Sequence, residues 1–296
     1  MCGHDGHAAA LCGLALAIEN QLAEGQNFER NIFLLFQPAE ETGEGAKSCL
    51  ELFEKEHINE IYGAHNLPGV PFGQVTTKPG TFACSSRGLI LRLEGKPAHA
   101  AYPENGISPA NCIGQILCTL QELANRKYYS GMTLCTVIGT NMGQKAFGMA
   151  ASDGEIWLTL RAEYENDLES LQEKILTLTE ELVQKDKLQF SYELQDVFPE
   201  TKNDENCAKK VLEVTNGIIL KEPMRWSEDF GHYLKVCKGT FFGIGAGEEY
   251  PALHTENYCY PTGLFMPTVE TFLSILQDSP NPSFKFYCNK ALNMIH

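Results

Sequence analysis

A short run at the start of the chain combines residue types that bind transition metals. The run is CGHDGH, at residues 2–7. A thiolate at Cys2 and an imidazole at His4, two residues apart, can bind one metal ion or two adjacent ions. Short Cys/His clusters are common, so this run alone is a weak indication of a metal site.

A second cluster, QPAEE at residues 37–41, follows an apolar run. Two adjacent carboxylates, Glu40 and Glu41, are costly to remove from water together unless positive charge lies beside them. Divalent cations supply that charge. One carboxylate can then ligate a cation while the other serves as a general base. For such a pair taken alone, a solvated acidic turn is the commoner interpretation.

Two histidines follow other apolar runs, His65 in GAHN at residues 63–66 and His254 in LHTEN at residues 253–257. A solitary histidine there is more often a hydrogen-bonded structural residue than a ligand. Ligands of open α/β sheets, however, bind beyond the carboxyl ends of the strands. The clusters together supply Cys, His, Glu, His and His at that edge, a set that suits two divalent ions.

Buried strands and intervening helices are needed to position these clusters. Continuous apolar runs are typical of strands buried on both faces of a parallel sheet. The runs are 32–36, 58–64 and 240–244, and the predicted helices lie around 8–23 and 46–55. The alternation predicts an α/β fold: a doubly wound, mostly parallel-sheet catalytic domain in two pieces, 1–81 and 198–296.

Residues 82–197 predict a smaller domain inserted between those pieces. Asn166, with Glu169 three residues later, predicts a capping box at the start of its second helix. The order β-α-β-β-α-β is that of a ferredoxin-like unit. Apolar alternation predicts the strands at 89–93, 134–138, 156–160 and 188–194, and helical spacing predicts helices at 107–125 and 166–182.

Composition limits the classes of partner and compartment. A net charge of −15 argues against nucleic acid or an anionic membrane surface as partner. We see no signal segment and no apolar run near the ~20 residues of a membrane span. The 11 cysteines, an odd number scattered through apolar stretches such as those around Cys112 and Cys118, are typical of free thiols. We therefore expect a cytoplasmic protein.

Six strings in this order resemble the M20 family of metallopeptidases and amidohydrolases. The similarity is to the branch with aminoacylase-like, hippurate hydrolase-like and auxin-conjugate hydrolase-like enzymes, and it covers almost all of residues 1–278. Members carry a segment ahead of the first string, with the opening strands of the sheet, so we expect an N-terminally incomplete sheet here. The strings are CGHDGH (2–7), QPAEE (37–41), GAHN (63–66), GKPAHAAYPENGISP (95–109), SEDF (227–230) and LHTENY (253–258).

The resemblance implies a role for each residue of these clusters. Glu40 would be the general base that takes a proton from the attacking water and returns it to the leaving amine. Family members use zinc, manganese or cobalt, and mixed thiolate, imidazole and carboxylate ligands do not select among them. Five residues would bind two divalent metal ions, with the first of them bridging both: Cys2, His4, Glu41, His65 and His254.

The resemblance also implies residues that support the site. Glu228 and Asp229 would hold the ligands in place. His99 lies on the inserted domain, which in this family acts as lid and dimerisation module. It would either help to hold the substrate and polarise its carbonyl, or be structural. A homodimer through this domain is therefore expected.

The expected reaction is hydrolysis of N-acyl amino acids, small molecules, to a carboxylate and a free amino acid. Within the same class, a dipeptidase or carboxypeptidase could use the same centre on a peptide bond. From another class, the chain could be a non-catalytic dimeric remnant of the fold. A structural single-zinc protein is a weaker alternative, because it needs four ligands and no open coordination position.

Overall fold

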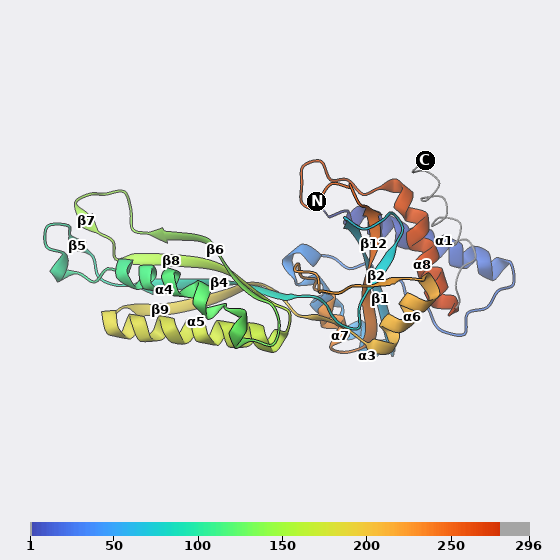
Figure 1. Cartoon of the computed structure of the whole chain (residues 1–296), viewed down its shortest axis with the longest axis horizontal. Coiled ribbons are helices and arrows are strands. Elements are labelled where there is room, and N and C mark those ends of the chain that lie inside the picture. The colour runs from blue at the N-terminus through green and yellow to red at the C-terminus, as the bar shows by residue number, and fades with distance from the viewer. Residues whose placement is uncertain (1, 279–296) are drawn as a thin grey trace.

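The chain folds into two lobes joined by a narrow connection (Figure 1). The computed structural model describes residues 2–278. Met1 and the tail 279–296 lie outside the described residues. Among residues 2–278 no helix combines the length and apolar character needed to cross a membrane. The ten cysteines of this range are free thiols.

The larger lobe is built on a four-stranded mixed sheet in the order β1-β12-β2-β11. β1 (Glu60–Pro68) and β12 (Lys238–Gly247) are parallel, and β11 (Ile218–Ile219) is parallel to β2 (Val75–Thr77). β12 and β2, however, are antiparallel. Two of the three strand pairs are thus parallel, as the predicted mostly parallel sheet requires, and the pair β12–β2 is the antiparallel exception. Only residues 69–74 separate β1 from β2, too few for the crossover that a parallel strand needs.

Helices cover both faces of this sheet. Successive residues of a strand point to opposite faces. Phe242 accordingly packs among side chains of α6 (Glu205–Thr215) and α8 (Phe265–Gln277), whereas Phe241 packs on the other side. α1 (His4–Ala23) lies against α8 as an outer layer. The helices on the Phe241 side are α2 (Gly45–Cys49), α3 (Glu51–Lys55) and α7 (Gly231–Leu234).

Residues 32–36 do not form the predicted buried strand. The segment joins no ladder with any strand of residues 2–278, and Phe33 and Phe36 are 48% and 52% exposed. Leu34 packs toward α1 and α8, and Leu35 packs toward the α3 and α7 side. A fully buried strand needs cover on both faces. Here the run is only partly covered, so its apolar content alone wrongly predicted a buried strand.

The smaller lobe is a four-stranded antiparallel sheet in the order β6-β8-β4-β9. The elements follow one another as β4-α4-β6-β8-α5-β9, which is the βαββαβ order. Both helices pack on one face, over the fully buried side chains of Leu89, Leu91 and Leu93. The elements are β4 (Ser85–Glu94), α4 (Ala110–Leu123), β6 (Thr133–Met142), β8 (Asp153–Ala162), α5 (Glu165–Asp186) and β9 (Gln189–Phe198).

The predicted capping box of α5 is wrong. The helix begins at Glu165 with Tyr164 at the N-cap, no side chain caps it locally, and Asn166 lies within the first turn. The Glu165 amide donates instead to Glu200 Oε2 at 3.1 Å. A residue distant in sequence thus satisfies the orphan donor, and no local pattern could show this.

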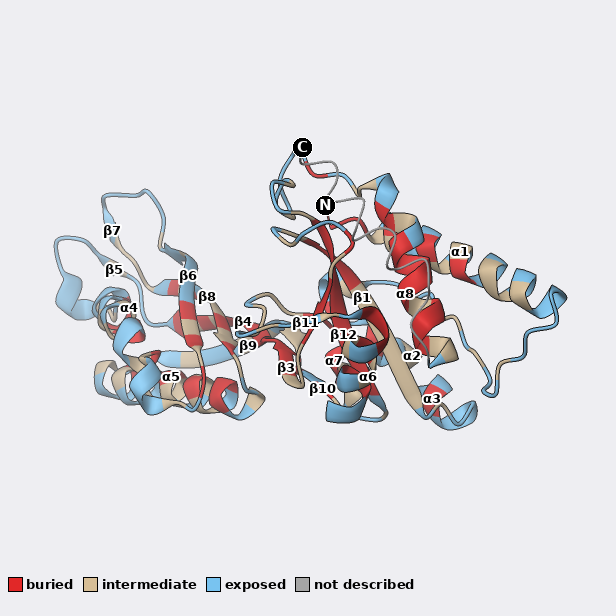
Figure 2. Cartoon of the chain, turned by 45° about the vertical axis from the view of Figure 1, so that its right-hand side comes forward, coloured by how far each residue is buried: buried red, intermediate tan, exposed pale blue. Residues whose placement is uncertain are grey.

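Two short strands, β3 (Gly80–Ala83) and β10 (Thr201–Asn203), pair where the lobes join. Figure 2 shows buried residues running along the strands of both lobes and through this connection. The Asn203 side chain donates to Thr77 Oγ1, Lys78 O and Phe241 O, and accepts from the Phe241 amide at 2.7 Å. Shorter elements are η1 (Glu40–Thr42), β5 (Ala98–His99), η2 (Pro103–Asn105), η3 (Arg126–Tyr128), β7 (Met149–Ala150) and η4 (Thr262–Leu264).

We predict that Asn203→Ala lowers the free energy of unfolding by about 2–4 kcal/mol, because it leaves buried backbone groups without partners. Urea unfolding measures this. Asn141→Ala, at an exposed position of β6, serves as control and should change stability by less than about 0.5 kcal/mol. Equal stability of the two variants would contradict the role assigned to Asn203.

Candidate metal centre

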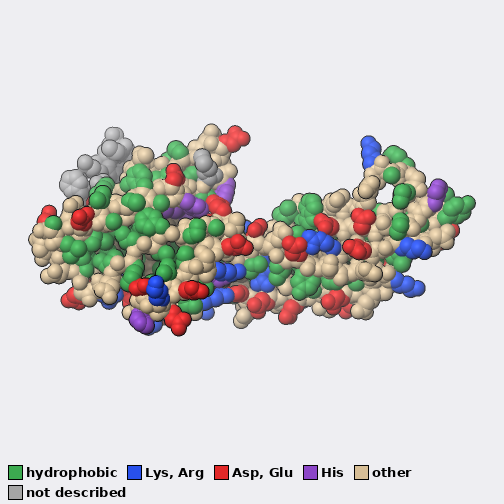
Figure 3. Space-filling model, turned by 180° about the vertical axis from the view of Figure 1, so that it is seen from behind, with side chains coloured by type: hydrophobic (Ala, Val, Ile, Leu, Met, Phe, Trp, Pro, Cys, Tyr) green, Lys and Arg blue, Asp and Glu red, His purple; other side chains and the backbone are tan. Residues whose placement is uncertain are grey.

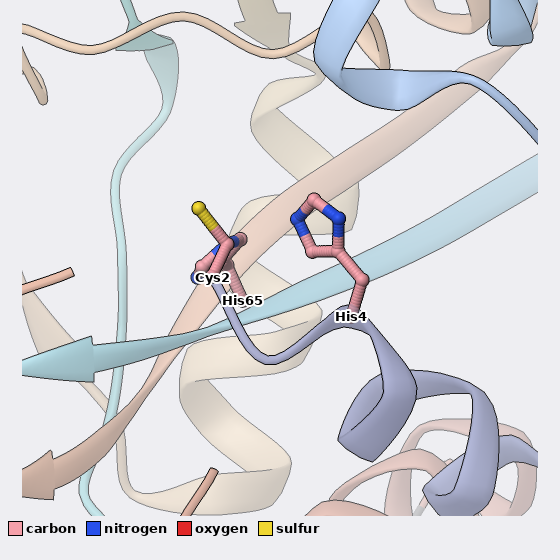
Figure 4. A group of neighbouring side chains, drawn as sticks. All are labelled: Cys2, His4 and His65. Atoms are coloured by element: carbon pink, nitrogen blue, oxygen red, sulfur yellow. The ribbon is translucent and has the colours of Figure 1, made fainter. Parts of the chain in front are cut away.

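Three potential ligands from two elements converge at the start of α1. Cys2 precedes the helix, His4 is its first residue, and His65 lies within β1. Their side chains gather around one point (Figure 4), with ligand atoms within 4.8 Å of one another. Gly3, between the first two, has a φ of 87°. That left-handed conformation suits glycine and turns Cys2 back over the helix start.

Two further groups share members with the first. Cys2 lies with Glu41 and His254, and His4 lies with Glu40 and Glu41. Cys2 Sγ is 2.9 Å from His254 Nε2, and His4 Nε2 is 3.7 Å from Glu40 Oε2. The structure therefore brings together all five predicted ligands and the predicted base.

Strained backbone holds two parts of this cluster. Ala39, just before Glu40, has a φ of 52°, and His254 has a φ of 64°. Non-glycine residues in this region cost about 1–3 kcal/mol each and are concentrated at functional sites. Strain at both positions is consistent with side chains placed for ligation rather than for stability.

Asp229 fastens the turn that carries the two adjacent glutamates. Its carboxylate accepts from Gln37 Nε2 at 2.9 and 2.8 Å and from the Ala46 amide at 2.8 Å, one on each side of Glu40 and Glu41. The turn closes through Gly45, where a Cβ would lie 1.7 Å from Pro38 O. Asp229 therefore occupies the supporting position expected from the sequence.

Four carboxylates are crowded together at this site. Burial raises the pKa of Glu228 well above its usual value, with the charges of Glu40 and Asp229 adding to the effect. Burial, with Asp229 and Glu41 beside it, raises the pKa of Glu40 to about 7. Across residues 2–278, no lysine or arginine forms an ion pair with any of the four. No lysine or arginine of the described residues thus balances this charge.

The His65 nitrogen is in a state suited to bind a cation, and the Cys2 sulfur would lose its proton on binding one. Burial lowers the pKa of His65 to about 3, so its imidazole is neutral. His65 Nδ1 donates to Asn66 O at 2.8 Å, which leaves Nε2 as the free donor atom. Burial and the nearby glutamates raise the pKa of the Cys2 thiol to about 12, a shift that an adjacent cation would reverse. The donor set therefore fits divalent metal ions.

Sequence reasoning gave no role to three residues at the site. His7, one helical turn after His4, has its ring centroid 4.7 Å from that of His65, and burial lowers its pKa to about 4. The spacing of three residues between His4 and His7, which places both on one face of a helix, was the signal that could have indicated a role for His7. Trp226 lies 5.7 Å from His65, ring to ring, and Tyr258 accepts from Asn66 Nδ2. Nothing in the local sequence indicated these last two contacts.

His99 lies apart from the cluster. It belongs to β5, at the end of the smaller lobe that is far from the start of α1 (Figure 1). The side chain is exposed, and its Nδ1 accepts from the Ala101 amide at 3.0 Å. From behind, histidine and acidic side chains are seen together on the larger lobe, on its side toward the smaller lobe (Figure 3). Within one chain, His99 is not part of the candidate centre.

We predict that His65→Ala weakens metal binding by more than the roughly 10–100-fold that follows loss of an outer hydrogen-bond partner. The variant removes a neutral, preoriented donor. Metal content after dialysis, measured by elemental analysis, tests this. His57→Asn, at an exposed position, is the control. The same metal content in both variants would contradict the assignment of His65.

Comparison with known proteins places this geometry in context. The model of peptidase family M20/M25/M40 matches residues 1–278. The chain is 29% identical over 258 residues to N-acetyl-L-cysteine deacetylase of Bacillus subtilis (strain 168), a match covering 86% of this chain and 61% of that protein. It is 28% identical over 259 residues to IAA-amino acid hydrolase ILR1-like 4 of Arabidopsis thaliana, covering 82% and 57%. The chain thus spans about three fifths of the length of these curated relatives.

The fold also matches solved structures. One is the YXEP protein of Bacillus subtilis, described as a dinuclear metal binding peptidase from the M20 family. The TM-score is 0.76 at 22% identity, covering 93% of this chain and 71% of that one. At this identity the match supports the fold alone.

Proposed function

Since the chain belongs to peptidase family M20/M25/M40, we propose that it hydrolyses the amide bond of N-acyl amino acids, releasing a carboxylate and a free amino acid. The observation that carries the proposal is the crowding of four carboxylates around imidazoles and a thiol, with no lysine or arginine of residues 2–278 paired to them. The names of the relatives, a deacetylase and an amino acid hydrolase, support the substrate class. Two divalent ions would be held by Cys2, His4, Glu41, His65 and His254.

Bound divalent ions supply Lewis acidity, which polarises the scissile carbonyl and lowers the pKa of water to about 7. Zinc, manganese and cobalt all suit this donor set. Glu40 Oε2 lies beside His4 and is the carboxylate oxygen we assign to proton transfer. It takes a proton from the attacking water and delivers it to the leaving nitrogen. Glu228, hydrogen-bonded to Glu40, orients it.

We assign the smaller lobe the role of lid and homodimer interface. β6 lies at the edge of its sheet, and Val137, Ile138 and Met142 on this strand are 43%, 61% and 43% exposed. An exposed edge strand with apolar side chains favours pairing with another chain. A substrate role for His99 requires a second chain or a large movement of the lobe. A cytoplasmic location stays a prediction.

We predict that Glu40→Gln lowers the rate of hydrolysis by about 10²–10⁴-fold, because the amide cannot accept the proton. Metal content should stay at the wild-type level. Release of free amine from N-acetyl, N-benzoyl and longer N-acyl amino acids measures the rate, with manganese or zinc added and a chelator-treated sample beside it.

The matched control is Glu51→Gln, on the exposed surface of α3. It should hydrolyse the substrates at the wild-type rate. Unchanged turnover by Glu40→Gln would rule out Glu40 as the base. A wild-type protein that binds metal but releases no amine from any substrate would favour the non-catalytic alternative.

A further inference from the structure

One arginine of the smaller lobe bonds to the segment of the larger lobe that leads into the candidate centre. Arg161, on β8, donates from Nη1 to Ser227 Oγ at 2.9 Å and to Arg225 O at 3.1 Å. β8 belongs to the antiparallel sheet of the smaller lobe. Ser227 directly precedes Glu228 and Asp229. The bonds therefore cross the boundary between the lobes.

The segment 224–227 contains neither a helix nor a named strand, so it depends on its neighbours for position. On one side, the Cys84 amide donates to Met224 O and Trp226 O at 3.0 and 3.1 Å, and the Met224 amide donates to Phe82 O at 2.7 Å. The side chain of Arg161 provides a separate attachment, at Arg225 and Ser227. Two lobes thus share the task of holding one short segment.

The neighbours of Ser227 on both sides, Trp226, Glu228 and Asp229, lie against the candidate centre. The Trp226 ring lies 5.7 Å from the ring of His65. Glu228 is 7% exposed and hydrogen-bonded to Glu40. Asp229 holds the turn around Glu40 through Gln37 and Ala46. A shift of Ser227 would therefore be transmitted directly to groups that surround the ligands.

We infer that Arg161 is a positioning residue of the candidate centre: by holding Ser227 and the Arg225 carbonyl, it makes metal affinity depend on how the smaller lobe sits on the larger one. The inference rests on the proposed metal centre. Arginine suits the task because the two N–H groups of Nη1 are fixed in the plane of the guanidinium, so that one nitrogen serves two acceptors in a set geometry. A lysine carries its ammonium on a flexible stem without the fixed planar geometry, and would restore the contact only in part.

A second contact across the same boundary provides a matched control. Lys235 Nζ lies 2.7 Å from Glu165 Oε1, which joins the residue directly after α7 of the larger lobe to the start of α5 of the smaller one. This ion pair is partly exposed and involves no residue of 224–229. Lys235→Met therefore removes an interlobe contact without releasing the segment.

The experiment titrates the metal-free full chain with Co²⁺ and follows the visible absorption of the bound ion. Arg161→Leu should weaken Co²⁺ affinity by up to about 10-fold, the low end of the range for loss of a ligand's own hydrogen-bond partner, because Arg161 bonds to no ligand directly. It should also change the absorption spectrum, because the ligands shift. Arg161→Lys should recover part of the affinity, and Lys235→Met should titrate like the wild type.

Ser227→Ala tests the contact from the other side with a minimal change of one hydroxyl, so it serves even if Arg161→Leu fails to fold. As a single variant it should weaken Co²⁺ affinity. In the Arg161→Lys background, where the same contact is already partly lost, it should weaken Co²⁺ affinity by less. Wild-type affinity in both Arg161→Leu and Ser227→Ala, or an equal loss in Lys235→Met, would overturn the inference while leaving the metal centre intact. A wild-type chain that binds no Co²⁺ would instead overturn the metal centre and this inference with it.

Discussion

The crowding of four carboxylates, with no lysine or arginine of residues 2–278 paired to them, is the constraint on which the site depends. Glu40, Glu41, Glu228 and Asp229 meet where β1, the start of α1 and the turn around η1 come together. Like charges at this separation raise one another's pKa values and oppose folding unless cations balance them. The imidazoles and the thiol beside them are suitable ligands for such cations. The electrostatics and the donor chemistry therefore both favour bound divalent cations at this site.

A few residues of the secondary structure place the ligands and the carboxylates of the site. β1 and β12 pair in parallel at the centre of the lobe, which places His65 beside Gly243 in the ladder. A left-handed glycine lets Cys2 approach the helix that begins with His4. Asp229 then ties the glutamate turn to the segment that follows Ser227. The site is thus built from segments far apart in sequence, each held by a specific local constraint.

The sequence was sufficient for the parts whose signal is local. Alternating leucines such as Leu89 and Leu91 predicted strands of the smaller lobe, and the metal-binding strings predicted a ligand set that the structure brings together. The parts that failed depend on contacts distant in sequence. Residues 32–36 have the composition of a buried strand but lack full cover. The amide of Glu165 is satisfied by Glu200 rather than by a local cap.

Side-chain contacts across the fold were beyond local patterns for the same reason. Trp226 and Tyr258 reach the centre from loops whose sequences carry no periodic signal, and Arg161 reaches Ser227 from the other lobe. The antiparallel placement of β2 follows from the length of the turn after β1, which a strand-by-strand prediction ignores. Connection length is readable from sequence and indicates the one antiparallel pair of an otherwise parallel sheet.

Anomalous diffraction from crystals of the full chain grown with Zn²⁺ tests the central claim most directly. Data collected on either side of the zinc absorption edge locate the ions independently of any assumption about the ligands. Two peaks among Cys2, His4, Glu40, Glu41, His65 and His254 are the predicted result. A single peak, or zinc bound only elsewhere on the protein, would contradict a dimetal centre.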